Sequence, residues 1–149
     1  MHSRTLPNFL PERRISAVGL WLAFSAWAAL LVYASTRPGS TGPVHPIIYY
    51  DKLQHLGFFF GGAMLLGAAM RATFPIRWTT IFLIAIIVLC GLGLADEINQ
   101  LFVEGRSGGD PFDWLADLIG SASGLAALRH FYAKRPRENP ATPPGDRTA

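Results

Sequence analysis

Long apolar runs alternate with short polar segments along this chain of 149 residues. The runs cover Ile15–Tyr33, Leu53–Met70, Trp78–Leu94 and Trp114–Phe131. A helix rises about 1.5 Å per residue and the hydrocarbon core of a bilayer is about 30 Å thick, so about 20 apolar residues cross it. Each run approaches this length. The pattern therefore predicts an all-α fold, an integral membrane bundle of four transmembrane helices with no separate soluble domain.

Charged residues gather at the ends of these runs and differ between the two sides. One side carries ten basic and three acidic residues, a formal +7, and the other carries three basic and seven acidic residues, a formal −4. Basic flanks stay in the cytoplasm. Both termini are therefore predicted to be cytoplasmic (N-in/C-in), and the loops 35–51 and 95–113 to face outward. The net charge of +3 reflects topology and does not indicate nucleic-acid binding.

The chain divides into one membrane domain and two polar ends. We expect a cytoplasmic N-terminal segment over residues 1–14, the membrane domain over 15–133, and a disordered cytoplasmic tail over 134–149 that is rich in proline and charge. The first apolar run, which follows Arg13 and Arg14, also fits a signal peptide. Its length exceeds that of a typical signal-peptide core, which favours an uncleaved anchor.

Small residues at a spacing of four recur in the second and fourth runs. Gly57 and Gly61 form one such pair, and Gly120 and Gly124 form another. Membrane helices approach each other closely at such positions. We expect the last three helices to form a tight bundle with the first helix more peripheral. The same Gly-x-x-x-Gly faces also fit a homodimer.

Ionisable and polar residues at helical spacing lie at the predicted outer ends of the second and third runs. Asp51 and His55 are four residues apart, so they share a helix face. Glu97 and Gln100 lie near each other if the third helix continues to residue 100. The loop that follows is rich in glycine and should hold Arg106 close to both groups.

The fourth run opens with three aspartates. Asp110 and Asp113 are suited to cap the helix, with Pro111 in its first turn. Asp117 lies one to two turns inside, where a carboxylate costs about 3 kcal/mol or more unless it faces the bundle and finds a partner. The candidate partners are Lys52, His55 and Arg106.

An ionisable residue within a membrane span indicates a functional site. The predicted catalytic residues are His55, Glu97 and Asp113. The predicted substrate-binding residues are Asp51, Lys52, Gln100, Arg106, Asp110 and Asp117. A divalent cation is one candidate cofactor, because Glu97, Asp110, Asp113 and Asp117 supply hard oxygen ligands, although no spacing requires it. The alternative is a buried ion-pair network that sets the helix register.

These stretches resemble the VanZ-like family of small four-span bacterial membrane proteins. The resemblance covers roughly residues 15–130 and rests on these residues in this order: Asp51-Lys52-x-x-His55, Glu97-x-x-Gln100-x-Phe102, Arg106, Asp110, Asp113, Gly120 and Gly124. The family usually has asparagine where this chain has Asp117. The family takes its name from a protein linked to resistance to the glycopeptide antibiotic teicoplanin. The resemblance implies a multi-pass protein of the bacterial cytoplasmic (inner) membrane with a role in the cell envelope, and it implies no particular reaction.

Three functions fit these residues. The first is an outward-facing site that acts on or shields the head group of a membrane lipid or lipid-linked cell-wall precursor. Lys52 and Arg106 would bind phosphate or carboxylate, and His55 and Glu97 would serve as general base and acid. The second is a non-catalytic membrane protein whose polar cluster is structural or binds a partner. The third, an ion-coupled carrier, is disfavoured because the inner halves of the runs lack polar residues. Enzymatic activity is left open, since no known nucleophile or phosphate-binding motif occurs.

Overall fold

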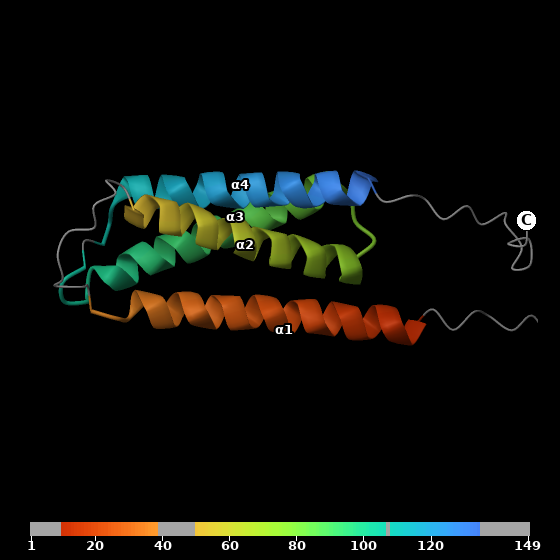
Figure 1. The fold of residues 1–149 in the computed structure, drawn as a ribbon, viewed down its shortest axis with the longest axis horizontal. Coiled ribbons are helices and arrows are strands. Elements are labelled where there is room, and N and C mark those ends of the chain that lie inside the picture. The colour runs from red at the N-terminus through yellow and green to blue at the C-terminus, as the bar shows by residue number, and fades with distance from the viewer. Residues whose placement is uncertain (1–9, 39–49, 107, 135–149) are drawn as a thin grey trace, which may run out of the picture.

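The computed structural model describes residues 10–38, 50–106 and 108–134, with side chains from residue 16 onward. Within these ranges the protein is all-helical, as predicted. Its four helices are α1 (Leu10–Ser35), α2 (Tyr50–Thr73), α3 (Trp78–Gln100) and α4 (Pro111–Lys134). They run alternately up and down, so α1 begins and α4 ends at the same end of the bundle (Figure 1). Residues 1–9 of the predicted N-terminal segment and 135–149 of the predicted tail lie outside the described residues.

Three of the described helices are long and apolar enough to cross a membrane: Ser16–Ser35 within α1, the whole of α2 and the whole of α3. α4 has 24 residues, the same length as α2, but is less apolar. Apolar side chains cover much of the outer surface of the bundle, and the exposed ones include Leu22, Val32, Leu83, Ile87, Leu115 and Ile119. So many large exposed apolar side chains are unusual for a protein surrounded by water. The fold is compatible with a multi-pass membrane protein.

α2 lies at the centre of the fold and packs most extensively along α4. Two glycines of α4 allow this close approach. A Cβ atom on Gly120 would collide with the backbone carbonyl of Leu56, and one on Gly124 would collide with that of Phe60. The backbones of the two helices therefore touch directly, as expected from the spacing of these glycines.

The glycine pair of α2 behaves differently. A Cβ atom added to Gly57 or Gly61 would meet no atom of the described part of the chain within 4 Å. Gly62 and Gly67 are the α2 glycines that face neighbouring helices. The Gly57–Gly61 register therefore does not pack this bundle, and a homodimer through that face stays a prediction.

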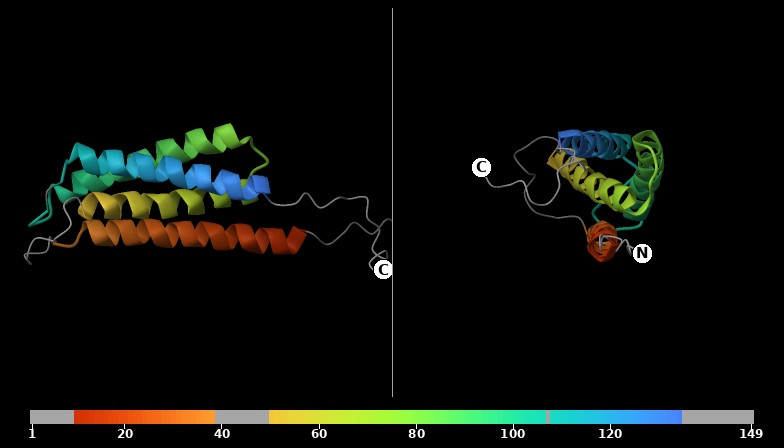
Figure 2. Two further views of the ribbon diagram at one scale, coloured as in Figure 1. Left: turned by 45° about the horizontal axis from the view of Figure 1, so that its top comes forward. Right: turned by 90° about the vertical axis from the view of Figure 1, so that its right-hand side faces the viewer.

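α1 is the peripheral helix, as expected, and lies beside the other three when the bundle is viewed along its axis (Figure 2). It rests on α2 mainly through Trp27. The indole ring lies over Gly62, where a Cβ atom would collide with it, and its Nε1 donates a hydrogen bond to the carbonyl oxygen of Phe58 at 3.1 Å. The ring also stacks on Phe58, with centroids 5.1 Å apart.

Candidate functional site

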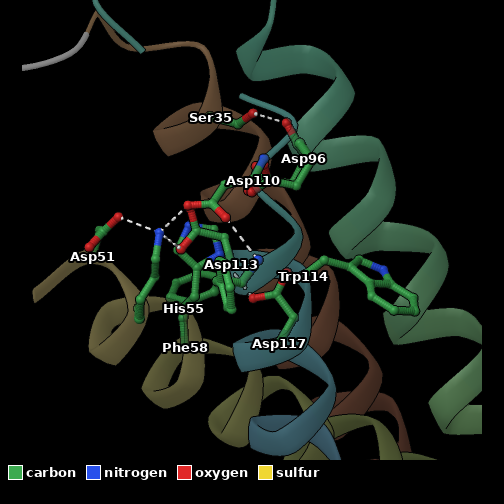
Figure 3. A network of polar contacts seen from close by, with 12 residues as sticks. Ser35, Asp51, His55, Phe58, Asp96, Asp110, Asp113, Trp114 and Asp117 are labelled. Atoms are coloured by element: carbon green, nitrogen blue, oxygen red, sulfur yellow. Dashed lines mark hydrogen bonds and ion pairs between the residues drawn. The ribbon is translucent and has the colours of Figure 1, made fainter. Parts of the chain in front are cut away.

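The carboxylates and their partners meet at one end of the bundle, where α2 and α4 begin and α3 ends (Figure 3). His55 lies five residues after the start of α2, Glu97 three residues before the end of α3, and Asp117 six residues after Pro111. These offsets correspond to about 5–9 Å along the helices. The three stretches predicted to meet are therefore brought to one depth.

Lys52 is the cation that joins α2 to the start of α4. Its Nζ lies 2.9 Å from Asp51 Oδ2, 2.5 Å from Asp110 Oδ2 and 2.8 Å from Asp113 Oδ1. Asp51 is exposed, whereas the Asp113 side chain is only 6% exposed. Lys52 was predicted to bind a phosphate or carboxylate of the substrate. In the structure its ammonium group is already surrounded by three carboxylates of the protein.

His55 pairs with Asp117, one of the pairings considered from the sequence. Nδ1 of His55 lies 2.9 Å from Oδ1 of Asp117, and the Asp117 side chain is 1% exposed. Gly93 of α3 makes room for the carboxylate, because a Cβ atom there would lie 2.6 Å from Asp117 Oδ2. Trp114 points away from this cluster and donates a hydrogen bond to the carbonyl oxygen of Cys90 on α3 at 3.2 Å (Figure 3).

Asp110 caps α4, as predicted. Its Oδ1 accepts a hydrogen bond from the backbone N–H of Phe112 at 2.8 Å, and Pro111 occupies the first helical position. Its own backbone N–H donates to Oε2 of Glu97 at 2.9 Å, which links the end of α3 to the start of α4. The hydrogen bond from Lys52 lowers the pKa of Asp110 below its ordinary value, because the ammonium group stabilises the carboxylate.

The glycines between α3 and α4 keep this connection compact. Gly109 has a φ of +79°, in the left-handed region where side chains are disfavoured. A Cβ atom on Gly108 would lie 2.6 Å from the carbonyl oxygen of Glu97 and 2.7 Å from the carbonyl carbon of Gln100. The loop therefore folds back onto the last turn of α3, which brings Asp110 to Glu97.

Asp96 is a buried member of the cluster that was not among the predicted site residues. It is 6% exposed, and its Oδ2 accepts a hydrogen bond from Nε2 of Gln100 at 2.7 Å. Gln100 was expected near Glu97, but its hydrogen bond goes to Asp96 instead. The four-residue spacing of Asp96 and Gln100 was the signal that could have revealed this pair. Ser35 of α1 completes the contact and donates to the carbonyl oxygen of Asp96 at 3.4 Å.

Several buried polar atoms have no hydrogen-bond partner within the described part of the chain. They are Asp96 Oδ1, Glu97 Oε1, Asp113 Oδ1, Asp117 Oδ2 and Ser121 Oγ. Asp113 Oδ1 still has its ion pair with Lys52. Buried polar atoms are almost always satisfied in native proteins. The remaining carboxylate oxygens at this end, on Asp96, Glu97 and Asp117, therefore distinguish the cluster from a closed structural network.

A cavity of about 380 Å³ opens beside the cluster. Its polar lining residues are Ser35, Asp51, Gln54, His55, Asp96, Gln100, Arg106 and Asp113, and its apolar wall includes Leu31, Phe58 and Phe59. Two of the three predicted catalytic residues, His55 and Asp113, line this cavity. Glu97 is 3% exposed and is not among the lining residues.

Arg106 is the cationic side chain of the cavity lining that remains available. It is exposed and makes no ion pair with the described residues. Its guanidinium group can bind a carboxylate or phosphate through two hydrogen bonds. The cavity thus combines an anion-binding group, a histidine and an aromatic wall.

Fold and site together define an all-helical protein with three helices able to cross a membrane and a polar cavity at one end. Comparison with known proteins adds no narrower class. No family model matches the chain, and no curated protein or solved structure is significantly similar to it. Membership of the VanZ-like family therefore stays a prediction.

Proposed function

We propose that this chain is a four-span membrane protein of the VanZ-like type that binds a lipid-linked or cell-envelope head group at the outer face of the bacterial cytoplasmic membrane. The fourth span is supported by the distribution of residues around α4. Its buried face carries the polar residues Asp113, Asp117 and Ser121. Its exposed large apolar side chains include Leu115 and Ile119, in the same part of the helix as the buried aspartates.

The charge distribution supports the proposed orientation. Arg71, Arg77, Arg129 and Lys134 lie near the end of the bundle opposite the cavity. The cavity end is dominated by carboxylates. Basic flanks are retained in the cytoplasm, so the cavity faces outward in this proposal, with both described chain ends inside.

The observation that carries the proposed ligand is the division of the cavity into two chemically different parts. Phe58 and Leu31 provide an apolar wall, and Arg106 provides a cation that forms no ion pair with the described residues. A lipid-linked molecule with a phosphate or carboxylate head group matches this combination. His55 lines the same cavity and can contact the bound group.

A structural role for the cluster is the second candidate, and the contacts of Lys52 favour it. One ammonium group that bridges three carboxylates ties α2 to α4 without any ligand. The buried oxygens without partners argue against this role for the whole cluster, because a structural network gains most when every member is paired.

The test is complementation in a native host that lacks the gene. Sensitivity to glycopeptides and pools of lipid-linked precursors are measured for wild type, His55→Ala, Arg106→Gln and Arg37→Gln. Arg37 is the matched control, because it is an exposed arginine at the same end that contacts Tyr33 and does not line the cavity.

We expect wild type and Arg37→Gln to restore either readout, and the two cavity variants to fail at equal membrane abundance. Restoration by abundant His55→Ala and Arg106→Gln would refute the binding role. Degradation of His55→Ala with normal activity of Arg106→Gln would favour the structural role.

A further inference from the structure

We propose that His55, Asp96 and Glu97 form a binding site for a divalent transition-metal ion. One ligand atom of each residue lies within 4.8 Å of the other two. Metal–ligand bonds of about 2.0–2.2 Å place the ligands of a tetrahedral zinc ion about 3.4 Å apart. The ligand atoms are therefore close enough that small side-chain rotations can bring all three within bonding distance of one metal ion.

The second polar atom of each side chain is already held by a neighbour. Asp117 bonds Nδ1 of His55 at 2.9 Å, and Gln100 donates to Oδ2 of Asp96 at 2.7 Å. The backbone N–H of Asp110 donates to Oε2 of Glu97 at 2.9 Å. Metal-binding histidines and carboxylates in proteins are oriented by such outer hydrogen bonds.

These contacts leave one further ligand atom on each residue. On His55 it is Nε2, because Nδ1 is bonded to Asp117. Oδ1 of Asp96 and Oε1 of Glu97 are buried and have no hydrogen-bond partner in the described part of the chain. Both residues are more than nine-tenths buried. A buried carboxylate oxygen without a partner is costly, and a cation between the two oxygens removes that cost.

The donor set selects the class of metal. One imidazole and two carboxylates suit zinc, manganese or ferrous iron, whereas magnesium and calcium favour oxygen ligands alone. A neutral imidazole and two ionised carboxylates together match the charge of a divalent ion. His55 and Asp96 line the cavity, so a fourth coordination position opens toward it.

The ligand set differs from the four carboxylates considered from the sequence. Asp110 and Asp113 are bound to Lys52, and Asp117 is bound to His55. Glu97 is the member shared by the two sets. The metal site does not depend on the identity of the head group proposed above, because metal binding is measured on the purified protein without a lipid ligand.

The experiment measures zinc binding to the purified full chain in detergent. Protein stripped with a chelator is dialysed against Zn²⁺, and bound metal is quantified by mass spectrometry for wild type, Asp96→Asn, Glu97→Gln and Asp117→Asn. Glu104→Gln is the matched control, since Glu104 is an exposed carboxylate in the neighbouring loop and belongs to neither the metal site nor the cavity lining.

We expect wild type and Glu104→Gln to bind one zinc ion per chain. Asp96→Asn and Glu97→Gln should bind more than tenfold more weakly, and Asp117→Asn about 10–100-fold more weakly, because it orients His55. X-ray absorption of zinc-loaded wild type should show one imidazole and oxygen ligands. Because this spectrum is measured on wild type, it tests the metal site even if one of the variants fails to fold. Wild type without stoichiometric zinc, a zinc spectrum without imidazole, or unchanged affinity in Asp96→Asn and Glu97→Gln would overturn the proposal.

Discussion

The contact between α2 and α4 gives the sharpest prediction about stability. Replacing Gly120 with alanine adds a Cβ atom 3.0 Å from the carbonyl carbon of Leu56 and 3.1 Å from its Cα, and closer still to its carbonyl oxygen. These atoms belong to the backbone of α2, so they cannot move aside as a flexible side chain would. The two helices must separate along a contact that continues to Gly124.

The magnitude follows from a comparison with Gly57→Ala. Alanine is favoured over glycine in a helix by about 0.8–1.0 kcal/mol, and this gain applies to both variants. Overpacking costs about 1–3 kcal/mol and applies only at Gly120, because a Cβ atom at Gly57 meets no described atom within 4 Å. Gly120→Ala should therefore be less stable than Gly57→Ala by about 1–3 kcal/mol.

The assay is reversible unfolding in mixed micelles, followed by the fluorescence of the four tryptophans. The free energies of unfolding of wild type, Gly57→Ala and Gly120→Ala are compared under the same conditions. Equal stability of the two variants would refute the direct backbone contact between α2 and α4.

The remaining predictions concern the charged end and the orientation. Lys52→Met leaves Asp110 and Asp113 without their cation and should lower the free energy of unfolding by about 1–3 kcal/mol. Arg37→Gln should change it by less than about 0.5 kcal/mol, so equal losses would contradict the bridging role of Lys52. In a Cys90→Ser background, Glu104→Cys should react with a membrane-impermeant maleimide in intact cells, and Arg77→Cys only after permeabilisation. The reverse labelling pattern would show that the proposed orientation is wrong.

The helices were predictable because apolar composition alone identifies segments of this kind. All four predicted runs fall within observed helices, but the helices extend further at their polar ends. The third apolar run ends at Leu94, and the sequence left open whether the helix continues to residue 100; α3 ends at Gln100. It continues because Asp96, Glu97 and Gln100 are buried in contacts with the rest of the bundle, so they remain helical beyond the apolar run.

Part of the site was predictable from the helical spacing of its residues. Helical spacing placed His55 and Asp117 at a similar depth, and they are bonded in the structure. Spacing did not reveal that Asp96 is buried in the cluster or that Gln100 donates a hydrogen bond to it. Spacing defines the faces of a helix, but it does not say which face points inward. The same limit applies to the glycines, since only the rotation of α2 decides that Gly57 faces outward.

Four helices and the gathering of carboxylates at one end could be predicted from the sequence alone, because length, hydropathy and charge act locally along the chain. The tertiary structure alone decided how each helix is rotated about its axis and which polar atoms are paired. Rotation depends on close contacts such as that between Gly120 and Leu56, which involve residues far apart in the chain. That rotation places three carboxylates around Lys52 and leaves one oxygen each of Asp96 and Glu97 without a hydrogen-bond partner in the described part of the chain. The proposed metal site rests on these two oxygens.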